Sequence, residues 1–279
     1  MRKAMWMAAM AAMPAAAAFA QQTGSQHFPP IHELLGTSSA ANLPQGDSDL
    51  RDSLGHQLTF KDNIRALTSQ SEKKRRDAVR RLGEKGEVRG VPYLSAVLLR
   101  SNADEKTRAD AAMSLGKIGH WKAVEILEES LGDPSVGVRF ASALALGHIQ
   151  AEDAVSLLAE TGIRDTHWWV RYASVVALGD TKSPAAVPAL AEVLSQDLRW
   201  QVRQQAARSL ARFNGKRVVG LLANALRDLD PSVRYSAAKS LGEIGGLDSL
   251  DALHGALETE RDAFARTAIR SALEKVVRN

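Results

Sequence analysis

Arginine and leucine recur at a fixed spacing through most of the chain. From about residue 72 onward, seven arginines are each followed seven residues later by a leucine, and successive arginines lie 31 to 33 residues apart. These arginines are Arg75, Arg108, Arg139, Arg171, Arg203, Arg234 and Arg266. Regular self-similarity of this length is typical of repeat architectures. It predicts about six and a half units between residues 72 and 279.

Within each unit, the apolar residues follow the period of two amphipathic helices. The first helix carries the arginine and the leucine, and alanine pairs such as Ala206-Ala207 let such helices approach closely. The second helix is marked by two apolar residues three positions apart, as at Val187 and Leu190. One unit cannot bury its apolar stripe alone, but stacked units form a continuous core. We therefore predict an all-α fold, a right-handed α-solenoid of HEAT-like helix-turn-helix repeats.

Turn residues set the limits of the predicted helices. Gly86, Gly119, Gly245 and Asn214 occupy the position after the first helix, where a left-handed residue commonly ends a helix. The predicted units are residues 72–103, 104–134, 135–166, 167–198, 199–229 and 230–261, with a half repeat at 262–279. A capping helix near residues 60–68, within segment 57–71, would cover the open end of the first unit with Ile64 and Leu67.

The first 20 residues have the pattern of an export signal. Arg2 and Lys3 precede 17 uncharged residues that end in Ala18-Phe19-Ala20, a small-x-small cleavage pattern. We expect a Sec-type signal peptide, cleavage after Ala20, and a periplasmic or secreted protein without an integral membrane span. An uncleaved anchor is the alternative. Residues 21–56 are rich in turn-forming residues and are predicted to be a mostly disordered linker.

The repeated string Val-Arg-x-x-Ala-Ala-x-x-Leu-Gly-x-Ile-Gly, as in residues 233–245, resembles the HEAT-like repeats of the phycobilisome lyases. That resemblance implies an aspartate six residues before each arginine, forming a ladder between units, and second helices that line a concave face. Aspartates stand at this offset at Asp133, Asp165, Asp197 and Asp228. The offset is occupied by Ser69, Asn102 and Glu260 elsewhere, which predicts looser packing toward both ends.

Composition removes several kinds of chemistry. The chain has no cysteine, so disulfides, thiolate metal sites and cysteine nucleophiles are excluded. It lacks a nucleophile elbow and a phosphate-binding glycine loop, and its seven histidines do not repeat at ligand spacing. A HEAT-like hydroxylase family binds di-iron through repeated His-Glu pairs, whereas this chain has one, His32-Glu33. We expect no catalytic residue, no metal and no cofactor.

Charge is uneven along the array. The formal net charge is +4, and it would fall to +2 without Arg2 and Lys3. Residues 71–122 carry a net +6, residues 123–199 a net −6, and residues 200–279 a net +4. Nucleic acid favours a continuous positive surface. The acidic middle interrupts one, so we expect no nucleic-acid partner, and the basic run at residues 73–76 is expected to be a solvated face.

These observations favour an exported scaffold for protein–protein interaction, with a lyase-like or enzyme-accessory protein that handles a small molecule or chromophore as the alternative. Aromatic residues with a nearby arginine suggest a binding hot spot on a solenoid edge. Its predicted members are Trp168, Trp169, Tyr172, Trp200 and Arg199. Trp168 and Trp200 share one repeat position, so we expect their indoles to form a short ladder. The alternative is that they pack over the seam between units.

A second predicted surface is acidic. Glu129, Glu160 and Glu192 occupy one position of successive second helices. If these helices line the concave face, the three carboxylates would meet a protein or peptide that enters it. The alternative is a solubilising face without a partner.

Overall fold

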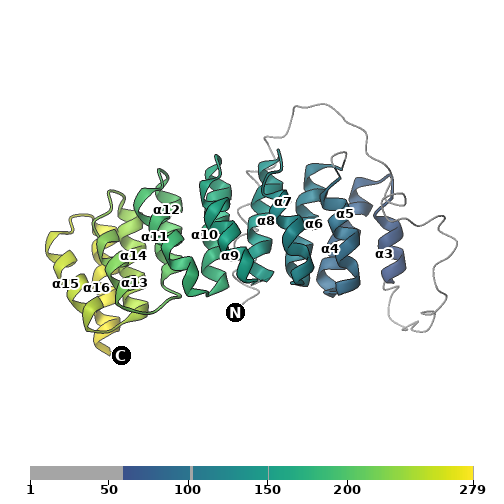
Figure 1. Ribbon diagram of the computed structural model, residues 1–279. Helices are drawn as coiled ribbons and strands as arrows, with labels where there is room; N and C mark the ends of the chain where they lie inside the picture. Colours follow the sequence, from purple (N-terminus) through teal and green to yellow (C-terminus); the bar gives the residue numbers. More distant parts are fainter. Residues whose placement is uncertain (1–58, 101–102, 150, 279) are drawn as a thin grey trace.

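The chain folds into an elongated row of helix pairs (Figure 1). The computed structural model describes residues 59–100, 103–149 and 151–278, and every regular element within these ranges is helical. The signal peptide and linker expected at residues 1–56 lie outside the described residues. The predicted all-α solenoid is confirmed.

Each unit consists of two antiparallel helices joined by a short turn. The first helices are α4 (Glu72–Lys85), α6 (Glu105–Ile118), α8 (Val136–Ile149), α10 (Trp168–Thr181), α12 (Trp200–Leu210), α14 (Pro231–Ile244) and α16 (Ala263–Arg278). The second helices are α5 (Val91–Leu98), α7 (Val124–Ser130), α9 (Glu152–Glu160), α11 (Val187–Gln196), α13 (Lys216–Ala225) and α15 (Leu247–Thr259). Short 3-10 turns are η2 (Val88–Gly90), η3 (Trp121–Ala123), η4 (Gly162–Arg164) and η5 (Pro184–Ala186).

The core is built from the leucines that define the repeat. The leucines of the first helices are buried throughout the array: Leu82, Leu115, Leu146, Leu178, Leu210, Leu241 and Leu273. Those of the second helices are equally buried: Leu94, Leu127, Leu158, Leu190, Leu222 and Leu253. Both sets belong to one continuous apolar cluster, which is the core that stacked repeats share.

Glycine after the leucine allows first helices of adjacent units to touch. A Cβ atom added at Gly147 would lie 2.6 Å from Cα and Cβ of Ala177 on the next first helix. At Gly116 the added atom would lie 2.6 Å from Cα of Ala145. These distances are shorter than real Cβ contacts, so only glycine permits this spacing.

Helix α12 departs from the pattern. It ends at Leu210 after 11 residues, whereas α10 and α14 each have 14, and its C-cap residue Ala211 stands where the other inner first helices have glycine. Asn214 was predicted to be a left-handed C-cap and is not one: the positive φ there belongs to Gly215. Lys182 is the only non-glycine with positive φ among the described residues, and it ends α10 at the equivalent position.

A short helix precedes the first unit. Helix α3 (Phe60–Ala66) begins at a capping box, in which Thr59 accepts the N–H of Asp62 and the Asp62 carboxylate accepts the N–H of Thr59. Leu67 is buried and Ile64 packs against the core. The Phe60 ring meets Tyr93 edge-on at 6.0 Å, and the Arg89 guanidinium lies over its face.

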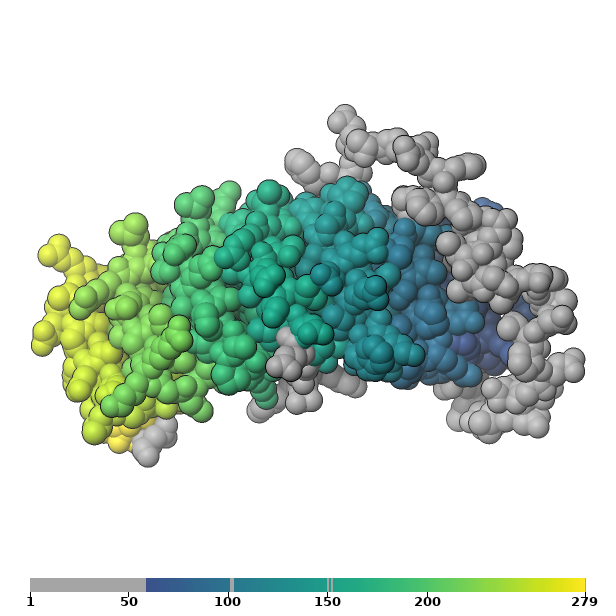
Figure 2. Space-filling model, in the orientation of Figure 1, coloured from purple at the N-terminus to yellow at the C-terminus, as the bar shows by residue number. Residues whose placement is uncertain are grey.

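The surface of the array follows its elongated form (Figure 2). None of the helices in the described part of the chain combines the length and apolar composition that a bilayer span needs.

Candidate functional site

The repeated arginine of each inner unit binds the carboxylate in the loop at the end of the same unit, just before the next first helix. Arg171 donates Nε and Nη2 to the two carboxylate oxygens of Asp197, at 2.7 and 3.0 Å. Equivalent pairs are Arg108–Asp133, Arg139–Asp165 and Arg203–Asp228. Arg139, Arg171 and Arg203 each make a two-point contact, whereas Arg108 binds through Nη1 alone. The partners' side chains are largely buried, so these contacts are weakly screened by solvent. The ladder implied by the resemblance is present.

Each ladder carboxylate also fixes the loop before the next first helix. Asp165 accepts the N–H of His167, and Asp197 accepts the N–H of Arg199. The same arginine reaches back to the loop that ends the preceding unit: Nη1 of Arg171 donates to the carbonyl oxygen of Asp165 at 3.0 Å. The repeated arginines and aspartates are therefore occupied in holding the units together.

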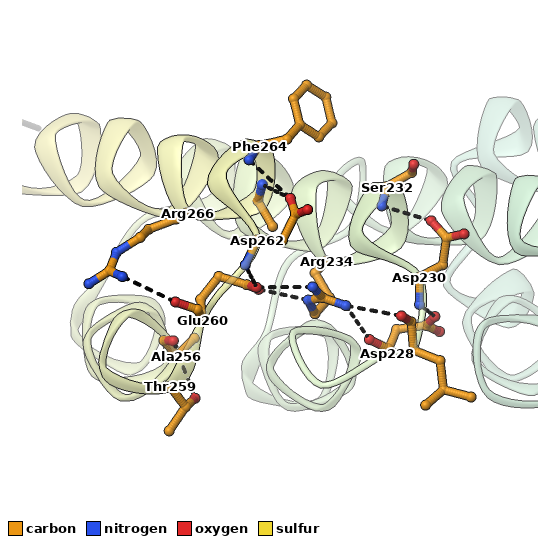
Figure 3. A network of polar contacts seen from close by, with 12 residues as sticks. Asp228, Asp230, Ser232, Arg234, Ala256, Thr259, Glu260, Asp262, Phe264 and Arg266 are labelled. Atoms are coloured by element: carbon orange, nitrogen blue, oxygen red, sulfur yellow. Dashed lines mark hydrogen bonds and ion pairs between the residues drawn. The ribbon is translucent and has the colours of Figure 1, made fainter.

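The ladder does not loosen at its C-terminal end, contrary to the sequence-based expectation. Glu260 accepts Nε and Nη2 of Arg234 at 2.7 and 2.9 Å, and it accepts the N–H of Asp262 at 2.8 Å (Figure 3). The longer side chain thus performs the role of aspartate. The hydrogen bond from Arg234 outweighs burial and holds the pKa of Glu260 below its ordinary value.

The N-terminal end is weaker. Arg75 contacts Asp104 through one nitrogen at 3.4 Å, because the usual aspartate is replaced by asparagine in that unit. Arg76 and Arg80 both bind Asp110 on α6. Two cations of the basic surface on α4 are therefore already paired, which supports its interpretation as a structural, solvated face.

Three of the predicted hot-spot residues lie together on α10. The rings of Trp168 and Trp169 are stacked with centroids 4.4 Å apart, and Tyr172 meets Trp169 edge-on at 6.0 Å. Phe140 of the preceding first helix contacts Trp169 edge-on at 6.1 Å. Burial among these rings raises the pKa of the Tyr172 phenol despite the nearby Arg208. Trp168 and Tyr172 also pack against the core. The cluster therefore fills the contact between two units and is partly exposed at the surface.

The expected ladder between Trp168 and Trp200 does not form. Trp168 stacks on its chain neighbour instead, and Trp200 makes no ring contact with any described aromatic residue. Trp200 is 38% exposed at the start of α12. Arg199 is exposed beside it in sequence, and its backbone N–H donates to Asp197 while its guanidinium pairs with no described carboxylate.

Sequence reasoning missed a second aromatic seam and two exposed leucines. Tyr235 and Phe264 stack with centroids 4.2 Å apart and an interplanar angle of 8°. Their separation of 29 residues equals that of Phe140 and Trp169, and this recurring separation could have revealed both pairs. Leu198 and Leu229, which follow ladder aspartates, are 94% and 96% exposed.

The acidic residues of the second helices differ in their surroundings. Glu129 on α7 and Glu160 on α9 are exposed. Glu192 on α11 accepts Nη2 of Arg164 at 3.0 and 3.2 Å, so its charge is compensated by a cation outside the predicted acidic surface. Glu160, Arg164 and Asp165 line a shallow depression between units. Among the described residues, no group of three or more histidines and carboxylates is arranged to hold a metal ion.

A family model and a solved structure of another protein, YibA, agree with this architecture. A family model described as HEAT repeats matches residues 61–139, 97–162, 129–201 and 187–274. The solved structure of YibA from Escherichia coli is 20% identical and aligns over 80% of this chain and 93% of that chain, with a TM-score of 0.51. The solved complex of CpcE and CpcF of phycocyanin lyase from Nostoc sp. PCC7120 is 25% identical over 84% of this chain and 100% of that chain, with a TM-score of 0.49.

The match to a relative found by sequence covers a much shorter part of the chain. Deoxyhypusine hydroxylase-B of Oryza sativa subsp. japonica is 37% identical over 76 residues, which is 27% of this chain and 25% of that protein. The match thus spans about a quarter of the relative's length. The family match, in contrast, extends over most of the described residues, and it coincides with the buried leucines and the arginine ladder. The chain belongs to the HEAT-repeat family.

Proposed function

We propose that this chain is an exported HEAT-repeat scaffold that binds another polypeptide and has no catalysis, metal or cofactor of its own. The observation that carries the proposal is the partly exposed aromatic surface at the starts of the first helices, with Trp168, Trp169, Tyr172 and Trp200 as its centre. Aromatic side chains with adjacent arginine, here Arg199, are enriched among residues that dominate binding energy.

The distribution of the repeated charges supports a binding role. Asp165, Asp197 and Asp228 each accept hydrogen bonds from an arginine and from a loop N–H. Groups occupied in this way stabilise the array and are not directed at a substrate. What remains available to a partner is the exposed surface along the edge and on the second helices.

The exposed carboxylates of Glu129 and Glu160 form a second proposed contact, for a basic segment of the partner. Glu192 would contribute less because Arg164 already neutralises it. Replacing Glu129 and Glu160 with lysine should weaken the binding of such a partner. The melting temperature should stay within about 2 °C of the wild-type value, as expected for exposed charges. Unchanged binding would remove this surface from the proposal.

Export is proposed on the sequence of residues 1–20. Intact mass of the protein recovered from a periplasmic extract should correspond to a chain that starts at Gln21. A full-length chain recovered only with membranes would contradict cleavage.

Native mass spectrometry of the protein purified from its own host tests the scaffold function. A bound polypeptide that is lost from the double variant Arg199→Glu with Trp200→Ala supports the proposal. The matched control is Trp121→Ala, because Trp121 is 67% exposed but follows the C-terminal end of α6, at the opposite ends of the first helices. A bound small molecule or chromophore in place of a polypeptide would favour the enzyme-accessory alternative.

A further inference from the structure

Aromatic residues are concentrated along one edge of the array. Seven of the 11 described phenylalanine, tryptophan and tyrosine residues lie at the first, second or fifth position of a first helix. They are Phe140 on α8, Trp168, Trp169 and Tyr172 on α10, Trp200 on α12, Tyr235 on α14 and Phe264 on α16. These positions share one side of a helix near its start, so the seven rings form a track across five consecutive units. We call this surface the aromatic edge.

Several apolar side chains on this edge are exposed to solvent. Phe264 is 56% exposed and Trp200 is 38% exposed. Leu198 and Leu229 are almost fully exposed in the loops that lead into α12 and α14. Exposed apolar side chains gathered in this way often mark an interaction site.

The cations next to the aromatic edge lack carboxylate partners, unlike the arginines of the ladder. Arg199, Lys239 and Arg261 are exposed, and none forms an ion pair with a described residue. Nε of Arg208 donates only to the hydroxyl of Ser236, at 3.3 Å. Uncompensated positive charge beside an apolar track favours a ligand that carries carboxylates between its apolar groups.

Two acidic residues on the same edge select against nucleic acid. Asp230 accepts the N–H of Ser232, and Asp262 accepts the N–H groups of Phe264 and Ala265 (Figure 3). These fixed carboxylates recur between the rings and would repel a phosphate backbone that followed the track. A peptide can place its carboxylates opposite the cations and its apolar side chains opposite the rings.

The spacing of the units matches an extended peptide. Packed helices lie about 8–10 Å apart, and glycine brings α8 against α10, α10 against α12 and α14 against α16. A polyproline II helix rises about 3.1 Å per residue and repeats every three residues, so it presents one side chain about every 9 Å on the same face. Aromatic surfaces are a known docking mode for such segments.

We propose that the aromatic edge binds an extended, proline-rich, acidic polypeptide segment that places one apolar side chain against each first helix from α8 to α16. This inference rests on the proposed scaffold function and specifies the chemistry of its partner. The apolar residue recurs every third position, and the intervening carboxylates face Arg199, Arg208 and Lys239.

The test uses the full chain and a fluorescein-labelled peptide of five Pro-Leu-Glu triplets, with binding measured by fluorescence anisotropy. We expect this peptide to bind at least tenfold more tightly than the same 15 residues with leucines at irregular spacing. Replacing glutamate by lysine in the peptide should abolish binding. Equal affinity for the regular and irregular peptides, or tighter binding of a 15-nucleotide oligothymidylate, would overturn the proposal.

Variants of the protein locate the site. Trp200→Ala with Phe264→Ala should weaken the triplet peptide at least tenfold without lowering the melting temperature by more than a few degrees, whereas Trp121→Ala should leave binding unchanged. A double variant that binds as tightly as the wild type would contradict the location. If the peptide fails to bind but the natural polypeptide is still captured and is lost from the Arg199/Trp200 variant, this inference is wrong and the scaffold function stands. If neither the triplet peptide nor a natural polypeptide binds the wild-type protein, both the inference and the scaffold function are refuted.

Discussion

Glu260 accepts two hydrogen bonds from the Arg234 guanidinium, at 2.7 and 2.9 Å, in a position that inner units give to aspartate. The extra methylene does not open the contact, because the backbone N–H of Asp262 holds the carboxylate from the other side. The last full seam of the array is therefore as firmly bridged as the inner ones.

Removing one member of a ladder pair should be costly. In Arg203→Met, the Asp228 carboxylate, 11% exposed, would lose both guanidinium hydrogen bonds. We expect a loss of about 3–5 kcal/mol in the free energy of unfolding, and a smaller loss when Asp228→Leu accompanies it. Urea unfolding checks both. Arg65→Ala is the matched control, because Arg65 is 83% exposed and lies 3.9 Å from Asp62; a comparable loss there would contradict the explanation.

The C-terminal units should lose stability in acid. The pKa of Glu260 is lowered from its ordinary 4.5, chiefly by the hydrogen bond from Arg234. For Asp228, burial acts to raise the pKa, but hydrogen bonds from Arg203 and the Asp230 N–H lower it overall from 3.8. A lowered folded-state pKa gives stability that is complete above the ordinary value and is lost as the pH falls through the folded value. The difference in unfolding free energy between wild type and Glu260→Gln should therefore shrink from pH 7 to pH 3. A constant difference would show that ionisation of Glu260 is not involved.

Two glycine-to-alanine substitutions should change the free energy of unfolding in opposite directions. Gly147→Ala inserts a methyl group 2.6 Å from the next first helix and should destabilise the protein by about 1–3 kcal/mol. Gly255 lies within α15, and an added Cβ would meet no atom within 4 Å. Gly255→Ala should therefore stabilise the helix by about 0.5–1 kcal/mol. Thermal unfolding followed by circular dichroism checks both, and equal effects would refute the close-approach argument.

The two tryptophans that share a repeat position should respond differently to truncation. Trp168 packs against the core and stacks on Trp169, so Trp168→Ala should cost about 2–3 kcal/mol. Trp200 has no aromatic partner among the described residues. Trp200→Ala should therefore lower the free energy of unfolding by less than about 1 kcal/mol. Equal losses in urea unfolding would show that both indoles belong to the core.

The sequence predicted the repeated parts of the structure well, because burial imposes the same demand on every unit. Leu146 and Leu178 are fully buried as expected, and Arg139 and Arg171 bind the aspartates implied by the resemblance. A residue at a fixed offset meets the same neighbour in each unit, so its role can be inferred from the period alone.

The details of the candidate site were less predictable, because they depend on side-chain orientation. Trp168 and Trp200 share a position, but Trp168 turns toward Trp169, which only its unit has. A shared position fixes where a Cα atom lies and leaves the ring direction to the local neighbours. Arg164 likewise reaches Glu192 in the next unit, a contact that no repeated column indicates.

Ala211, the alanine that interrupts the glycine column, affects how the array responds to force. Glycine brings α8 against α10, α10 against α12 and α14 against α16, whereas α12 ends early and has alanine at the equivalent position. Elastic elements in series deform first at the softest one. Bending of the array should therefore concentrate between α12 and α14, so that the units before and after this seam swing as two stiff segments about an elastic joint.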